Sequence, residues 1–137
     1  MAAPDSFLYE YAVVRYVPRV DREEFINIGL VMLCKRRKWL RGEVRFDPGR
    51  ILAFDPKVNP ETLMNQASIF MRGDVPSADI PVEERYRWLT AVKSAVLQVS
   101  PSHPGLLSRA EGIESGESEA LGRLDKEFDR LMIELVG

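Results

Sequence analysis

Apolar residues alternate with polar ones in three early segments, and this period of two predicts β-strands. The first segment, residues 7–17, is rich in aromatic and β-branched side chains and ends at Pro18, which cannot donate to a ladder. The second segment, residues 25–34, is apolar on nearly both faces, as a central strand is. One of its predicted faces is unbroken: Ile26, Ile28, Leu30, Met32 and Cys34. Gly29 indicates a bulge or a close backbone approach in this strand. The third segment, residues 39–46, has one polar, solvent-exposed face and forms a hairpin with the second segment.

Helical spacing replaces the alternation after this hairpin. Apolar spacing and the start signals Asp47-Pro48 and Asn59-Pro60 predict four helices: residues 49–54, 60–71, 82–93 and 117–136. Residues 95–100 predict a fourth strand and residues 101–116 a loop. The last helix carries one apolar stripe: Leu121, Leu124, Phe128, Leu131 and Leu135. The same stripe suits either a core or a helix in a dimer.

The order of these elements predicts the fold class. Strands followed by helices, a strand and a helix predict an α+β fold, with an antiparallel sheet of three to four strands and helices packed on one face. A chain of 137 residues matches one ordinary domain. We therefore expect residues 1–137 to form a single α+β domain.

Composition narrows the class of protein. The formal net charge is −2, whereas a dedicated nucleic-acid binder usually carries a basic excess. The N-terminal residues lack the features of a signal peptide, and no apolar run approaches the roughly 20 residues of a membrane span. We therefore expect a cytoplasmic protein without a membrane anchor.

Chemistry-bearing motifs are scarce. The single cysteine, Cys34, lies in an apolar run, and the single histidine, His103, lies in a predicted loop. No pair of ligands has zinc spacing, and no glycine-rich phosphate loop occurs. The sequence predicts no metal and no cofactor, and it favours Cys34 as a core thiol.

Arg15 is the residue that folding alone explains least, because it lies inside a strongly apolar strand. An arginine in such a place needs a carboxylate or phosphate partner. Glu23 or Glu24 could supply the carboxylate. The alternative is an anion or ligand site formed by Arg15, Tyr16 and Asn27, with His103 as a further candidate.

A basic run from Lys35 to Arg41 marks the tip of the predicted hairpin. In one interpretation Arg36 and Arg37 contact phosphates while Trp39 stacks on a base. In the other, which the acidic overall charge favours, these are solvated turn and edge charges that discourage aggregation.

Residues 11–18 (Tyr-Ala-Val-Val-Arg-Tyr-Val-Pro) and 24–31 (Glu-Phe-Ile-Asn-Ile-Gly-Leu-Val) together form a double motif. With residues 52–56 and 96–101, this motif resembles a family of bacterial proteins, the domain of unknown function 3037. The resemblance implies no activity and no catalytic residues. Members stand beside genes for kinases similar to the HipA toxin-kinase family, which implies a partner or regulator of such a kinase.

Three interpretations of function follow. The sequence favours a non-enzymatic accessory or regulatory binding protein that acts through protein–protein contacts. Its partner is a kinase or a second copy, bound through the C-terminal helix or a sheet edge. The second interpretation is a small ligand-binding domain or enzyme with an anion site around Arg15, and the third is nucleic-acid binding through the basic hairpin.

Overall fold

The computed structural model describes residues 7–72, 80–91, 94–107 and 117–137, and the account below concerns these residues. Their centre is an antiparallel sheet with strand order β3-β2-β1-β4, in which β5 also pairs with β1. The strands are β1 (Phe7–Tyr16), β2 (Ile26–Cys34), β3 (Trp39–Val44), β4 (Leu97–Val99) and β5 (His103–Leu107). The remaining elements are η1 (Val20–Arg22), α1 (Pro48–Phe54), α2 (Pro60–Arg72), α3 (Val82–Thr90), α4 (Glu117–Leu131) and a π-helical turn η2 (Met132–Val136). The predicted α+β class is confirmed.

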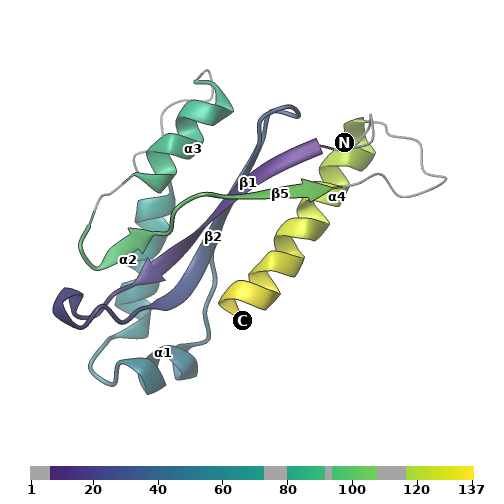
Figure 1. Ribbon diagram of the computed structural model, residues 1–137. Coiled ribbons are helices and arrows are strands. Elements are labelled where there is room, and N and C mark those ends of the chain that lie inside the picture. Colours follow the sequence, from purple (N-terminus) through teal and green to yellow (C-terminus); the bar gives the residue numbers. More distant parts are fainter. Residues whose placement is uncertain (1–6, 73–79, 92–93, 108–116) are drawn as a thin grey trace.

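Helices cover both faces of the sheet, which corrects the expectation of one covered face. Figure 1 shows α2 and α3 on one side of the sheet and α4 on the other. Residues of α1, α2 and α3 share one buried cluster with the sheet, and residues of α4 and η2 share a second. The physical reason lies in β2, whose side chains are buried on both faces and therefore need a layer on each.

The predicted unbroken face of β2 is interrupted by a β-bulge. Val14 is opposite Gly29 but Arg15 is opposite Asn27, so Ile28 is the extra residue. The bulge exchanges the faces: Ile26 and Ile28 belong to the cluster with α1–α3, whereas Leu30, Met32 and Cys34 belong to the cluster with α4. The predicted close approach at Gly29 is confirmed, since a Cβ there would lie 2.6 Å from the carbonyl oxygen of Glu43.

A fifth strand, β5, lies where the sequence predicts a loop. Pro104 and Gly105 indicated irregular structure, but both residues suit this position. β5 pairs on one side with the first half of β1, and a proline is tolerated in such an edge strand. Gly105 leaves room for the ring of Tyr9, which a Cβ would overlap.

Ser100 joins β4 to β5 along the same side of β1. Its hydroxyl accepts a hydrogen bond from the backbone N–H of Val13 at 2.8 Å and donates to the carbonyl of Pro101 at 2.9 Å. Ser100 is 4% exposed, so these bonds satisfy a buried polar group. The remainder of the predicted loop, residues 108–116, lies outside the described residues.

The apolar stripe of α4 belongs to the core. Leu124 and Phe128 are fully buried against the sheet, and Leu131 is 5% exposed. Arg41 of β3 lies over Phe128, with its guanidinium carbon 4.2 Å from the ring centroid. The same side chain forms ion pairs with Asp125 and Asp129 of α4. Leu121 and Leu135 are partly buried against the same cluster, so the stripe faces the sheet of its own chain.

Among the helices of the described segments, none combines the length and hydropathy that a bilayer span requires.

Candidate functional site

Arg15 and Asn27 lie opposite each other on β1 and β2, on the sheet face that α4 covers. The guanidinium carbon of Arg15 lies 4.1 Å from the ring centroid of Phe25, a cation–π contact. Glu23 and Glu24 are the carboxylate partners that the sequence suggests for Arg15, but Glu24 forms an ion pair with Arg22 instead. The side-chain nitrogen of Asn27 donates to the carbonyl of Leu135 at 2.9 Å.

Two buried polar atoms at this place have no hydrogen-bond partner within the described residues: Nε of Arg15 and Oδ1 of Asn27. The first is a donor and the second an acceptor. An anion would satisfy the arginine and oppose the amide oxygen. A water or a hydroxyl group could accept from one and donate to the other.

Tyr16 faces the opposite side of the sheet. It packs against the cluster with α1–α3, and its hydroxyl donates to Oδ2 of Asp55 at 2.8 Å. Burial and this hydrogen bond raise the pKa of Tyr16 to about 12. Asp55 lines a shallow hollow of about 630 Å³ between the β1–β2 connection and the α1–α2 connection. The side chains of Tyr16 and Arg15 therefore lie on opposite faces of the sheet.

His103 begins β5 and lies opposite Tyr11, near the middle of β1. Its ring is exposed, and the two ring centroids are 5.3 Å apart. The four ligand candidates from the sequence thus divide into a pair, Arg15 and Asn27, and two separate residues.

The basic hairpin places its candidates at the β2–β3 turn. Arg36 is exposed and Arg37 is half-buried. Trp39 lies edge-on to Phe128 of α4, with ring centroids 6.4 Å apart. Arg41 is held by the carboxylates of α4. Two residues of the run therefore contact α4 instead of extending into solvent.

Cys34 is fully buried in the cluster beneath α4. Burial raises the pKa of its thiol, so the thiol stays protonated at neutral pH. Within the described ranges, no three side chains of the metal-ligating kinds come together.

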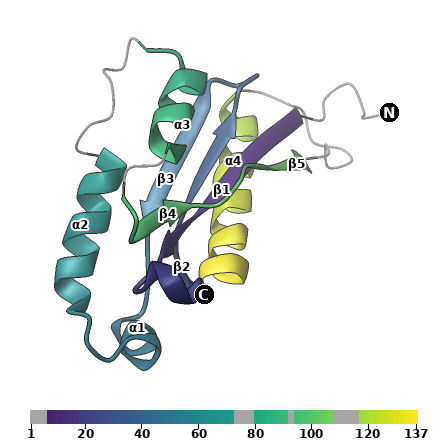
Figure 2. The same ribbon diagram turned by 60° about the vertical axis from the view of Figure 1, so that its left-hand side comes forward.

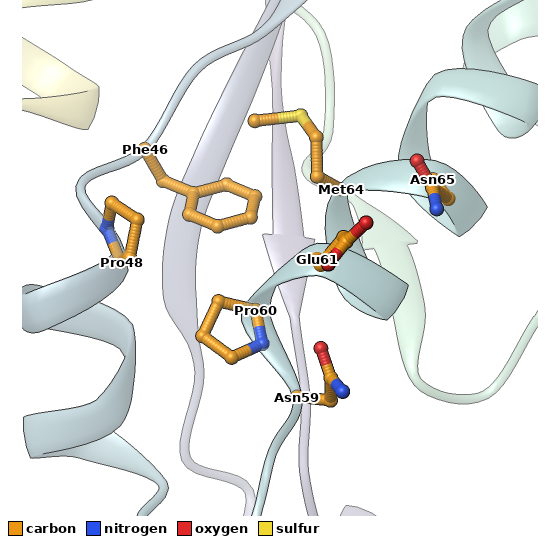
Figure 3. A pocket seen from close by; sticks show the side chains of 7 residues that line it. All are labelled: Phe46, Pro48, Asn59, Pro60, Glu61, Met64 and Asn65. Atoms are coloured by element: carbon orange, nitrogen blue, oxygen red, sulfur yellow. The ribbon is translucent and has the colours of Figure 1, made fainter.

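A hollow of about 490 Å³ opens beside the start of α2, and we call it the Phe46 hollow. Its lining residues are Phe46, Pro48, Asn59, Pro60, Glu61, Met64 and Asn65. Figure 3 shows the ring of Phe46 between Pro48 on one side and Pro60 and Met64 on the other, with Glu61 and Asn65 along α2. The site therefore has an apolar floor and a polar rim on which Glu61 is the charged lining residue.

Helix-start signals build this hollow. The carboxylate of Asp47 accepts from the backbone N–H of Arg50, and the side chain of Asn59 accepts from that of Thr62. Each cap is followed by a proline at the helix start, so the two prolines frame Phe46 from both sides. Sequence reasoning identified both starts but missed the hollow, because nothing in the pattern reveals that the two starts meet around Phe46.

Residues 11–114 match the family described as protein of unknown function (DUF3037). The chain belongs to this family. The match includes the bulge between β1 and β2, the Phe46 hollow and both edges of the sheet, and it ends before α4. No curated protein and no solved structure matches the chain.

Proposed function

We propose that this member of the DUF3037 family is a non-enzymatic accessory protein that binds another protein, with the Phe46 hollow as the docking site. The supporting observation is the composition of the hollow: an apolar floor of one ring, two prolines and a methionine, with polar groups at the rim. Such a hollow accepts one apolar side chain. Burying a leucine- or phenylalanine-sized side chain contributes about 1.5–3 kcal/mol.

The charge of Glu61 indicates what kind of segment binds in the Phe46 hollow. Glu61 is exposed in the first turn of α2 and has no ion pair within the described residues, so its carboxylate favours a cation nearby. The occupant is therefore a segment of a partner protein with an apolar anchor next to a lysine or arginine. The resemblance to proteins encoded beside kinases similar to the HipA family makes such a kinase the first partner to test.

A displayed library of random peptides tests the chemistry of the hollow without knowledge of the partner. Peptides selected on the folded protein should share an apolar residue beside a basic one. The Met64→Ala variant should bind them at least tenfold more weakly, since losing one wall of the hollow removes more than about 1.4 kcal/mol.

Ile69→Ala is the matched control, because Ile69 lies on the same helix, is 62% exposed and does not line the hollow. Its affinity should equal that of the unchanged protein. Peptides that bind both variants equally, or a selection with no basic residue beside the anchor, would refute the docking site.

The buried atoms at Arg15 and Asn27 favour a second candidate, a site for a small ligand. We propose a hydroxyl-bearing ligand there instead of an anion, since a hydroxyl group is both an acceptor for a donor such as Nε and a donor to an acceptor such as Oδ1. Screening small alcohols and sugars by NMR, with the Asn27 side-chain amide as the reporter, tests this alternative. A spectrum that no compound shifts would count against it.

A further inference from the structure

β3 forms one edge of the sheet, with β2 on its inner side (Figure 2). The backbone N–H of Arg45 donates to the carbonyl of Ile28, which continues the β2–β3 register one step beyond the pair of Gly29 and Val44. Hydrogen-bonded and non-bonded pairs alternate along an antiparallel ladder, so the backbone groups of residues 39, 41 and 43 also face β2. Those of Leu40, Gly42 and Val44 therefore face outward.

The opposite edge is less suited to pairing. It consists of β4, which has three residues, and β5, which contains Pro104. Short strands and prolines are the devices by which proteins protect sheet edges. β3 has six residues and contains no proline.

A hollow of about 240 Å³ lies beside the outer edge of β3. It is lined by residues 42–45 of the edge and by Ser68 and Met71 of α2. Leu40 and Val44 project to this same side of the sheet and are only partly buried. The edge thus offers backbone groups, two apolar side chains and space for similar side chains from a neighbour.

We propose that a second copy of this chain occupies this edge, forming a two-fold dimer in which two β3 strands pair antiparallel with Gly42 opposite Gly42 of the second copy. This inference does not rest on the proposed function, since the hollow beside β3 and the Phe46 hollow share no lining residue. Leu40 exchanges backbone hydrogen bonds with Val44 of the other copy, and Gly42 exchanges them with Gly42. The two sheets become one continuous sheet.

This register pairs complementary side chains on both faces. Arg41, which already pairs with Glu43, Asp125 and Asp129 of its own chain, lies opposite Glu43 of the second copy, and a further opposite charge across a ladder contributes roughly 0.2–1 kcal/mol. Arg45, which pairs with Glu43 of its own chain, lies opposite Trp39 of the second copy, whose indole also contacts Phe128. On the other face, Leu40 lies opposite Val44 of the second copy, above the hollow that Met71 borders.

The charged side chains of the edge strand also disfavour the two neighbouring registers. Moving the strands so that Leu40 is opposite Gly42 brings Arg41 opposite Arg41. Moving them the other way, with Gly42 opposite Val44, brings Glu43 opposite Glu43. Like charges directly opposite are destabilising, so the alternation of Arg41, Glu43 and Arg45 selects the proposed register.

Sedimentation velocity over a concentration series tests the dimer. The unchanged protein should pass from monomer to dimer. Val44→Pro removes an outward N–H and no bond to β2, so it should weaken dimerisation at least tenfold while circular dichroism stays native. Val44→Ala keeps the N–H and should remain a dimer. A protein that stays monomeric at every concentration, or equal dimerisation of the two variants, would overturn the proposal.

Disulfide trapping tests the register and does not depend on the proline variant. Arg41→Cys and Glu43→Cys chains, mixed under mild oxidation, should form a covalent heterodimer, because directly opposite residues lie within disulfide range. Each variant alone should not, because its cysteines lie on a diagonal of about 7–8 Å. Cys34 is buried and should stay reduced. Equal trapping in the separate and mixed samples would refute the register.

Discussion

Removing the ring of Phe128 tests whether α4 is part of the core. Phe128 is fully buried between α4 and the sheet. It contacts the indole of Trp39 edge-on and lies beneath the guanidinium of Arg41. Phe128→Ala therefore leaves a cavity and removes two aromatic contacts at once.

The expected loss follows from these contacts. Phenylalanine-to-alanine substitutions in cores cost about 3–5 kcal/mol in free energy of unfolding. The edge-on aromatic pair and the cation–π contact, each on the order of 0.5–1.5 kcal/mol, favour the upper half of that range. Since a domain is stable by only about 5–15 kcal/mol, Phe128→Ala should be marginal at best. Phe128→Leu keeps most of the volume and should lose about 1.5 kcal/mol.

Urea unfolding followed by tryptophan fluorescence and circular dichroism measures these values. Ile133→Ala is the control, because Ile133 is 69% exposed and its loss should change the free energy of unfolding by no more than about 0.5 kcal/mol. If Phe128→Ala cost no more than the control, about 0.5 kcal/mol or less, the helix would not be part of the core. The apolar stripe would then be available to a partner.

Three further substitutions test local contacts. Gly105→Ala places a Cβ on the ring of Tyr9, so it should lower the free energy of unfolding by about 1–3 kcal/mol. It should also speed amide hydrogen exchange in β5, and unchanged exchange would contradict the contact. Tyr16 has a folded-state pKa of about 12, above its usual 10, so its stabilisation is full below pH 10 and is lost as pH rises toward 12. Tyr16→Phe should flatten this alkaline loss, and an unchanged alkaline profile would refute the bond to Asp55. The hydrogen bond from Arg130 holds the pKa of Glu127 below its usual value of 4.5, so its stabilisation is present above that value and lost as pH falls further. Glu127→Gln should therefore reduce the acid sensitivity of unfolding, which is followed by urea titration at several pH values, and an unchanged slope would count against the pairing.

Local patterns predicted the strands and helices well, because each of these elements depends on residues that are close together in the sequence. The alternation in residues 7–17 and 39–46, and the caps at Asp47 and Asn59, act within a few residues of chain. The bulge at Ile28 was only indicated through Gly29, and its effect on the faces of β2 depends on pairing with β1. The same limit applies to β5, because Pro104 and Gly105 are acceptable only beside Tyr9 and at a sheet edge.

The candidate sites depended more on tertiary structure. Arg15 and Asn27 were identified from sequence order, and the sheet brings them opposite each other. Tyr16 is separated from them by the alternation of the strand, and His103 by the register of β5, which places it opposite Tyr11. The Phe46 hollow could not be predicted, since it joins two helix starts whose distance in space the sequence does not specify.

Capture of a partner from native extract tests the central claim, that this chain acts by binding another protein at the Phe46 hollow. The tagged full chain, its Met64→Ala variant and its Ile69→Ala variant are compared at moderate salt, and bound proteins are identified and quantified. We predict one protein bound in equimolar amount to the unchanged chain and to Ile69→Ala, and lost from Met64→Ala. Equal recovery of that protein on all three, or no stoichiometric protein on any of them, would contradict the claim.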